Sequence, residues 1–206
     1  MMNLNMPGME LRMVNRDSLM TLEAYSRARK EFCAKVMAHK KNRKVYLGSH
    51  VTLLFEDEFT IRYQIQEMLH AEKIFEEEGI QDELEAYNPL IPDGSNWKAT
   101  MLIEYPDVEQ RRQMLTKLKG VEKQVWVQAA GCGRVYAIAD EDMEREDEEK
   151  TSAVHFLRFE LTPEMIRSLK HGAALVMGID HPAYQVAGET VVDAVRSSLI
   201  KDLRDS

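Results

Sequence analysis

The sequence contains little cysteine and no long apolar run. Its two cysteines, Cys33 and Cys132, lie far apart, and neither belongs to a disulfide or metal-binding motif. No stretch approaches the roughly 18 apolar residues that would cross a bilayer. The N-terminal segment lacks the pattern of a secretory signal. These absences favour a chain that folds without disulfide bonds in the reducing cytoplasm and has no membrane partner.

Motifs of the common enzyme classes are also missing. The sequence has no phosphate-binding loop, no dinucleotide-binding glycine pattern, no serine-nucleophile elbow, no zinc-protease helix motif and no CxxC pair. Their absence removes the enzyme classes that are easiest to read. It leaves open whether the protein is an enzyme, and no cofactor is indicated.

Charge is distributed unevenly along the chain. The net charge is −8, and residues 140–149 alone hold eight acids and one arginine, a net −7. A segment of this kind has no apolar stripe and predicts a flexible insertion. Residues 27–44 have the opposite character, with eight Lys or Arg against Glu31. Because this basic block lacks an aromatic platform for bases, nucleic acid is not the expected partner.

Hydrophobic spacing predicts a mixture of helices and strands. The main predicted elements are helices over about 17–41, 58–75 and 81–87 and strands over 97–105, 151–161 and 174–179. A hairpin is expected around Gly131–Gly133, and a last helix is expected to begin at Thr190. The elements do not alternate strictly. The sequence therefore predicts one α+β domain over 1–206, with a largely antiparallel sheet of about seven strands packed against amphipathic helices.

Three stretches resemble a known bacterial family. They are RYQIQEMLHAEKIFEE (62–77), YNPLIPDGSNWKATMLIEYPD (87–107), and ADEDMERE with TSAVHFLRFEL (139–161). Over most of its length the chain resembles the bacterial domain of unknown function family 3501. Members tend to be encoded near rubrerythrin-like and iron–sulfur oxidoreductase genes, so the resemblance implies a link to redox or peroxide-stress metabolism. We expect Arg in the family where this chain has His70.

Glu72 is the first candidate site residue. It falls in the apolar stripe of the second helix with Ile61, and a buried carboxylate must be paired, hydrogen-bonded or protonated. Arg29 lies in the stripe of the first helix, so a structural Arg29–Glu72 ion pair is expected. His155 shares the apolar face of its strand and is expected to be a hydrogen-bonded core histidine. If Glu72 and His155 meet, the pair becomes a candidate catalytic site with shifted pKa values.

Glu67 and His70 have the Glu-x-x-His spacing that di-iron helical bundles use. A single copy is a weak signal, and both residues lie opposite the apolar stripe of their helix. A solvated face is the favoured interpretation. Glu67, His70 and His155 are the candidate metal ligands.

The polar loop over 87–94 is the candidate ligand-binding segment, because loops of this kind often carry binding groups. Its candidate groups are Tyr87, Asn88 and Asp93, and Arg29 joins them from the first helix. The alternative interpretation is a connection that two prolines make rigid.

The residues and the resemblance favour an accessory or binding protein in redox or oxidative-stress metabolism. One alternative is a small-ligand-binding protein or enzyme with a buried carboxylate–histidine site. A second alternative is a metal-binding module built from carboxylates and histidine. The expected partner is a protein of redox metabolism, and self-association is also left open.

Overall fold

The computed structural model describes residues 13–139 and 150–204 of the chain. The predicted insertion at 140–149 lies outside the described residues. The helices are α1 (Leu22–Lys40), α2 (Glu58–Glu72), α3 (Glu77–Tyr87), α4 (Val108–Lys117), α5 (Pro163–Lys170) and α6 (Asp193–Ile200). The strands are β1 (Lys44–Leu47), β2 (Val51–Phe55), β3 (Asn96–Ile103), β4 (Val125–Ala129), β5 (Val135–Tyr136), β6 (Ile138–Ala139), β7 (Val154–Glu160), β8 (Leu175–His181) and β9 (Tyr184–Thr190).

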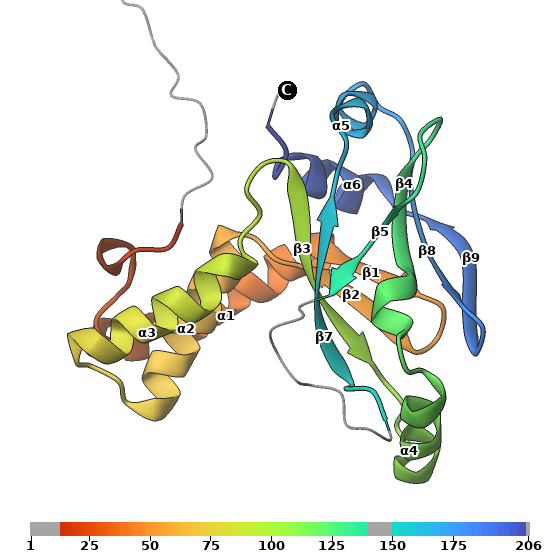
Figure 1. The fold of residues 1–206 in the computed structure, drawn as a ribbon. Coiled ribbons are helices and arrows are strands. Elements are labelled where there is room, and N and C mark those ends of the chain that lie inside the picture. The colour runs from red at the N-terminus through yellow and green to blue at the C-terminus, as the bar shows by residue number, and fades with distance from the viewer. Residues whose placement is uncertain (1–12, 140–149, 205–206) are drawn as a thin grey trace, which may run out of the picture.

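The strands form two sheets, with the orders β1-β2-β3-β7-β6 and β5-β4-β8-β9 (Figure 1). Every pairing is antiparallel, which confirms the predicted α+β class and sheet type. The sequence pattern indicated one sheet, whereas the chain divides its strands between two. Ala137 joins β5 to β6, so the chain passes from one sheet to the other at that residue.

The main core lies between the two sheets. Alternate side chains of each strand point inward, and the largest are Trp97, Phe55 and Phe159, all fully buried. Trp97 also donates a hydrogen bond from Nε1 to the carbonyl of Leu199, at 3.0 Å. The end of α6 is thereby fixed to the core.

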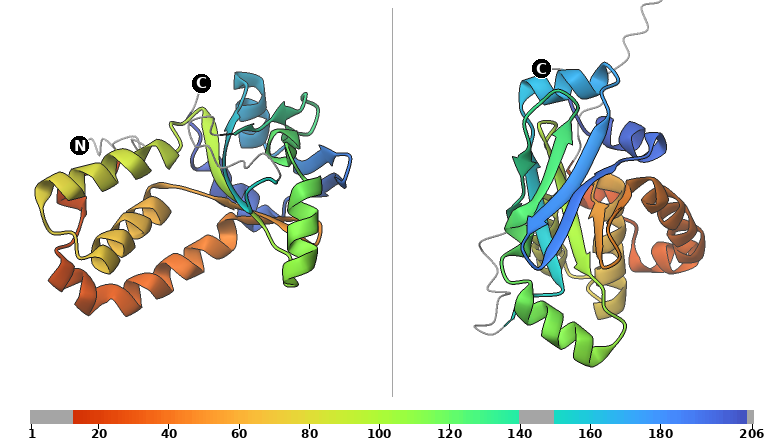
Figure 2. Two further views of the ribbon diagram at one scale, coloured as in Figure 1. Left: turned by 60° about the horizontal axis from the view of Figure 1, so that its bottom comes forward. Right: turned by 90° about the vertical axis from the view of Figure 1, so that its right-hand side faces the viewer.

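Helices α1, α2 and α3 form a helical lobe that extends away from the strands (Figure 2). A second apolar cluster holds it together, in which Ile61, Ile65 and Leu69 of α2 lie with Ile80 and Leu84 of α3. Within the described residues, no helix combines the length and the apolar character needed to cross a bilayer.

Two element predictions are wrong in detail. The helix expected to run to residue 75 ends at Glu72, because Lys73 adopts the left-handed conformation (φ 56°) and caps it. Phe75, expected in the apolar stripe, is therefore 72% exposed. At the other end of the chain, β9 was not predicted, and Thr190 ends that strand instead of starting a helix.

Candidate functional site

Glu72 and His155 lie in different parts of the molecule. Glu72 is exposed at the last residue of α2, so the expected burial and the expected Arg29–Glu72 pair are both wrong. The helix ends immediately after it, because Lys73 adopts the left-handed conformation. His155 is buried on β7, with Nε2 2.9 Å from the carbonyl oxygen of Ser152 and 3.0 Å from Oγ1 of Thr151. The structure therefore does not bring a carboxylate–histidine pair together from these two residues.

The acid that Arg29 contacts is Glu67. Nε and Nη2 of Arg29 lie 2.8 and 2.7 Å from the two carboxylate oxygens, and the Tyr25 hydroxyl donates to the same carboxylate. The hydrogen bond from Arg29 holds the pKa of Glu67 below its usual range, despite partial burial. The His70 ring lies edge-on to Tyr25, with 5.8 Å between centroids. We call these four residues the Glu67 cluster; it fastens α1 to α2.

The candidate metal ligands are not gathered into one site. Glu67 and His70 belong to the helical lobe, whereas His155 lies in a sheet. Across the described parts of the chain, no group of three or more His, Cys, Asp or Glu residues is arranged to hold a metal ion.

Polar groups of the 87–94 loop are used within the fold. The Asn88 amide accepts from the backbone N–H of Val14 and donates to its carbonyl, each at 2.9 Å. Asp93 accepts from Ser95 and from the Asn96 side chain. Tyr87 packs against the second apolar cluster. The loop thus ties the N-terminal segment to the lobe and shapes its own turn.

A buried ionic group that sequence reasoning missed joins the helical lobe to α6. Arg43 is 1% exposed, and its guanidinium contacts both carboxylate oxygens of Asp202, the closer at 2.5 Å. Asp57 lies 3.4 Å from Nε of Arg43 and 2.5 Å from Nε2 of His39. We call these four residues the Arg43 junction. No local signal reveals it, because Arg43 and Asp202 are 159 residues apart.

An aromatic and charged surface lies on the outer face of the second sheet. Trp126 stands on the opposite side of β4 from the residues that enter the main core, and its Nε1 donates to Asp180 at 3.1 Å. Arg134 and the Tyr136 hydroxyl donate to the same carboxylate, at 2.8 and 2.6 Å. The hydrogen bonds to Asp180 hold its pKa below the usual range, and the bond from Tyr136 has the largest effect. Ile138 adjoins this surface along the chain: it is exposed two residues beyond Tyr136, with the buried Ala137 between them, and it begins β6 of the first sheet.

We call these five residues the Trp126 surface, and its outermost members are partly open to solvent. The guanidinium of Arg134 stacks on the Trp126 ring, 3.9 Å from its centroid. Tyr136 is 43% and Ile138 41% exposed, whereas Trp126 is fully buried. The arrangement presents the oriented side chains of Arg134 and Tyr136 at the surface.

Glycine makes room for the Trp126 ring. Gly178 pairs with Trp126 across β4 and β8, and a Cβ added there would lie 2.3 Å from Cζ2 of the ring. Gly188 on β9 gives similar space, with 3.3 Å to the ring. The ring therefore lies across neighbouring strands of this sheet.

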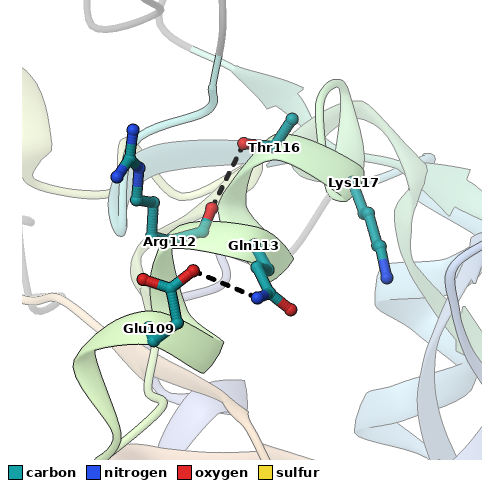
Figure 3. Close-up of a pocket in the computed structure, with 5 residues that line it drawn as sticks. All are labelled: Glu109, Arg112, Gln113, Thr116 and Lys117. Atoms are coloured by element: carbon teal, nitrogen blue, oxygen red, sulfur yellow. Dashed lines mark hydrogen bonds between the residues drawn. The ribbon is translucent and has the colours of Figure 1, made fainter.

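A shallow surface hollow lies along α4 (Figure 3). Its lining residues are Glu109, Arg112, Gln113, Thr116 and Lys117. All come from one helix, where Gln113 donates to Glu109 at 3.1 Å and Thr116 donates to the carbonyl of Arg112. Both contacts stay within the helix, and none of the other described elements contributes a residue to the lining of the hollow.

Comparison with known proteins shows the family to which the chain belongs. The family described as "Protein of unknown function (DUF3501)" matches residues 13–203. This chain belongs to that family. A crystal structure of a protein of unknown function from Burkholderia pseudomallei K96243 is similar, with 56% sequence identity and a TM-score of 0.89. The match covers 94% of this chain and 100% of that one. No curated protein matches the chain significantly.

Proposed function

We propose that this protein is a non-catalytic binding protein that serves as an accessory in redox or oxidative-stress metabolism, and that a partner protein docks on the Trp126 surface. The observation that supports docking is the exposed Arg134 and Tyr136 beside a buried tryptophan, with the exposed Ile138 next to them along the chain. Tyrosine, tryptophan and arginine supply much of the binding energy at protein interfaces. Stacking on Trp126 and the hydrogen bond to Asp180 already orient Arg134. Its side chain therefore loses little rotational freedom when a partner binds.

The redox assignment rests on the family resemblance, whose members tend to be encoded near rubrerythrin-like and iron–sulfur oxidoreductase genes. A cytoplasmic location is part of the same proposal. It is supported by the two cysteines, Cys33 and Cys132, which are free and half-buried.

A non-catalytic role is supported by how the polar candidates are used. Both oxygens of Glu67 accept hydrogen bonds from neighbouring side chains, and Asp93 is engaged by its own turn. His155 binds the backbone beside it. These groups position elements of the fold and leave little capacity to orient a substrate.

Calorimetric titration with a purified rubrerythrin-like protein tests the proposal. Ile138→Asp places a charge in the docking face and should weaken binding about 30-fold, the loss typical of an interface hot spot. Val192→Asp is the matched control, because Val192 is also an exposed apolar residue, at 65%, but lies before α6. The control should bind like the wild type.

Two results would count against the proposal. Equal binding by the two variants would exclude the Trp126 surface as the docking site. Absence of binding to both the rubrerythrin-like protein and an iron–sulfur oxidoreductase would remove the redox link.

A further inference from the structure

The Arg43 junction contains more negative than positive fixed charge. One arginine lies between two carboxylates, Asp202 at 2.5 Å and Asp57 at 3.4 Å. Arg43 also donates to the backbone carbonyls of Phe55 and Glu56, both at 2.9 Å, and to the hydroxyl of Ser198 at 3.5 Å. Arg43 therefore has no further charged partner among the described residues, and one carboxylate must find compensation elsewhere.

The other groups that face the junction come from every element packed around it. His39, at the end of α1, contacts Asp57, and Ser198 on α6 lies 3.5 Å from Arg43. The carboxylate of Glu56 is directed to other partners, the hydroxyls of Thr60 and Thr100, at 2.6 and 2.7 Å. His39 thus faces Asp57, whereas among the described residues the charged group in contact with Asp202 is Arg43; the more distant charges of His39 and Asp57 act on the pKa of Asp202 in opposite directions.

Asp202 connects the segment after α6 to the base of the helical lobe. It follows α6 and binds Arg43 of the short helix η2 (Lys41–Arg43), which continues directly from α1. Two residues later the backbone N–H of Arg204 donates to the carbonyl of Gly94, at 2.9 Å, in the loop that leads from the lobe to β3. The C-terminal segment therefore crosses the base of the helical lobe and is fixed on both sides.

We propose that the Arg43 junction is a proton-dependent latch, in which the protonation state of Asp202 sets how firmly α6 and the segment 201–204 are held against the base of the helical lobe. In the protonated state the junction has one carboxylate for one arginine. In the ionised state a second negative charge is buried at the same place. The latch is tight when the proton is bound and looser when it is lost.

The direction of the effect follows from linkage. Burial raises the pKa of Asp202 to about 6, although the charge and hydrogen bonds of Arg43 oppose the rise. A raised pKa means that the closed state binds the proton more strongly than an open, solvated state does. The extra stability of the closed state is thus fully present below the usual pKa of aspartate and is lost as the pH rises through about 6.

Hydrogen exchange of the full chain tests the latch. Amide exchange in α6 and 201–204 is followed between pH 4 and pH 7 and corrected for intrinsic exchange rates. A rise of about two pKa units predicts that the local opening constant increases by about 50-fold over this range, because an open-state aspartate is already partly ionised at pH 4. In Asp202→Asn, which cannot ionise, this increase should vanish.

Asp193→Asn is the matched control on the same helix, because the Asp193 side chain is 93% exposed. It should retain the wild-type pH dependence. The proposal is overturned if Asp202→Asn keeps the wild-type dependence, or if wild-type opening falls as the pH rises. Should Asp202→Asn not fold, the side-chain carboxyl NMR signal of Asp202 in the wild type decides instead: a midpoint near 6 supports the latch, and a midpoint near 4 overturns it.

Discussion

Strand β3 buries five of its eight residues, whereas α1, with nineteen residues, buries only Tyr25 and Val36. Apolar contact between two sheets is enough to fix β3. Because α1 has so little fully buried surface, polar contacts add to the packing of the Phe32 ring against α2 in positioning it. They run from Arg29 and Tyr25 to Glu67 and from His39 to Asp57. The comparison shows that directional polar bonds take over where the apolar interface is thin.

Removing the guanidinium of the junction should have the largest effect. Arg43→Ala leaves Asp202 buried without its counter-charge, which typically costs about 3–5 kcal/mol. Urea unfolding followed by circular dichroism at pH 7 measures the loss. Lys41→Ala is the control, since Lys41 is exposed on the same short helix, and it should change stability by less than about 0.5 kcal/mol. Similar values for the two variants would mean that polar bonds do not secure the base of the lobe.

Adding a methyl group at Gly178 in the second sheet should lower stability less than Arg43→Ala does, through packing alone. Gly178→Ala forces the Trp126 ring to move and should cost about 1–3 kcal/mol, the range for overpacked cores. Its control is Gly133→Ala, because a Cβ at Gly133 meets nothing within 4 Å. Urea unfolding and Trp126 fluorescence report the change. An unchanged midpoint for Gly178→Ala would show that this sheet is packed less tightly than the structure indicates.

Local pattern was enough to predict much of the fold. Alternation over 97–105 and 151–161 corresponds to β3 and β7, because each strand has one face in the core. Strand β9 was missed because Val186 is its single buried residue, so no alternating signal exists. Two further features have no sequence pattern that would predict them. They are the register shift between β8 and β9 and the passage of the chain from one sheet to the other.

The candidate site was less predictable, since its geometry depends on long-range contacts and on one backbone conformation. The helical wheel that placed Glu72 inside assumed a helix continuing to Phe75, but Lys73 ends it without a glycine to signal the stop. Arg29 was expected to pair with Glu72, whereas its partner on α2 is Glu67. The partner of Arg43 is distant in sequence and follows from the fold alone.

Within the lobe, Glu67→Gln should lower stability at pH 7 by about 1 kcal/mol, because a charge-assisted pair at a half-exposed site is lost. Its pKa is lowered in the folded protein, so its contribution is present above the usual pKa of glutamate and disappears as the pH falls through the lowered value. The difference between wild type and variant should therefore shrink below about pH 4. Urea unfolding at pH 7 and pH 3 measures the stability difference between wild type and variant at each pH. A difference that grows in acid would contradict a stabilising role for the ionised Glu67.

The smallest effect is expected at the end of the same helix. Glu72 is exposed, and its charge contributes, after burial, to the raised pKa of Glu83 on α3. It also stands at a helix C-terminus, where a negative charge is unfavourable. Glu72→Ala should thus change stability by less than about 0.5 kcal/mol, in the stabilising direction. Glu67→Ala, one helical turn earlier, is the comparison and should be clearly destabilising in the same urea titration. A loss of several kcal/mol for Glu72→Ala would instead reveal a buried partner and restore the ion pair that the sequence pattern suggested.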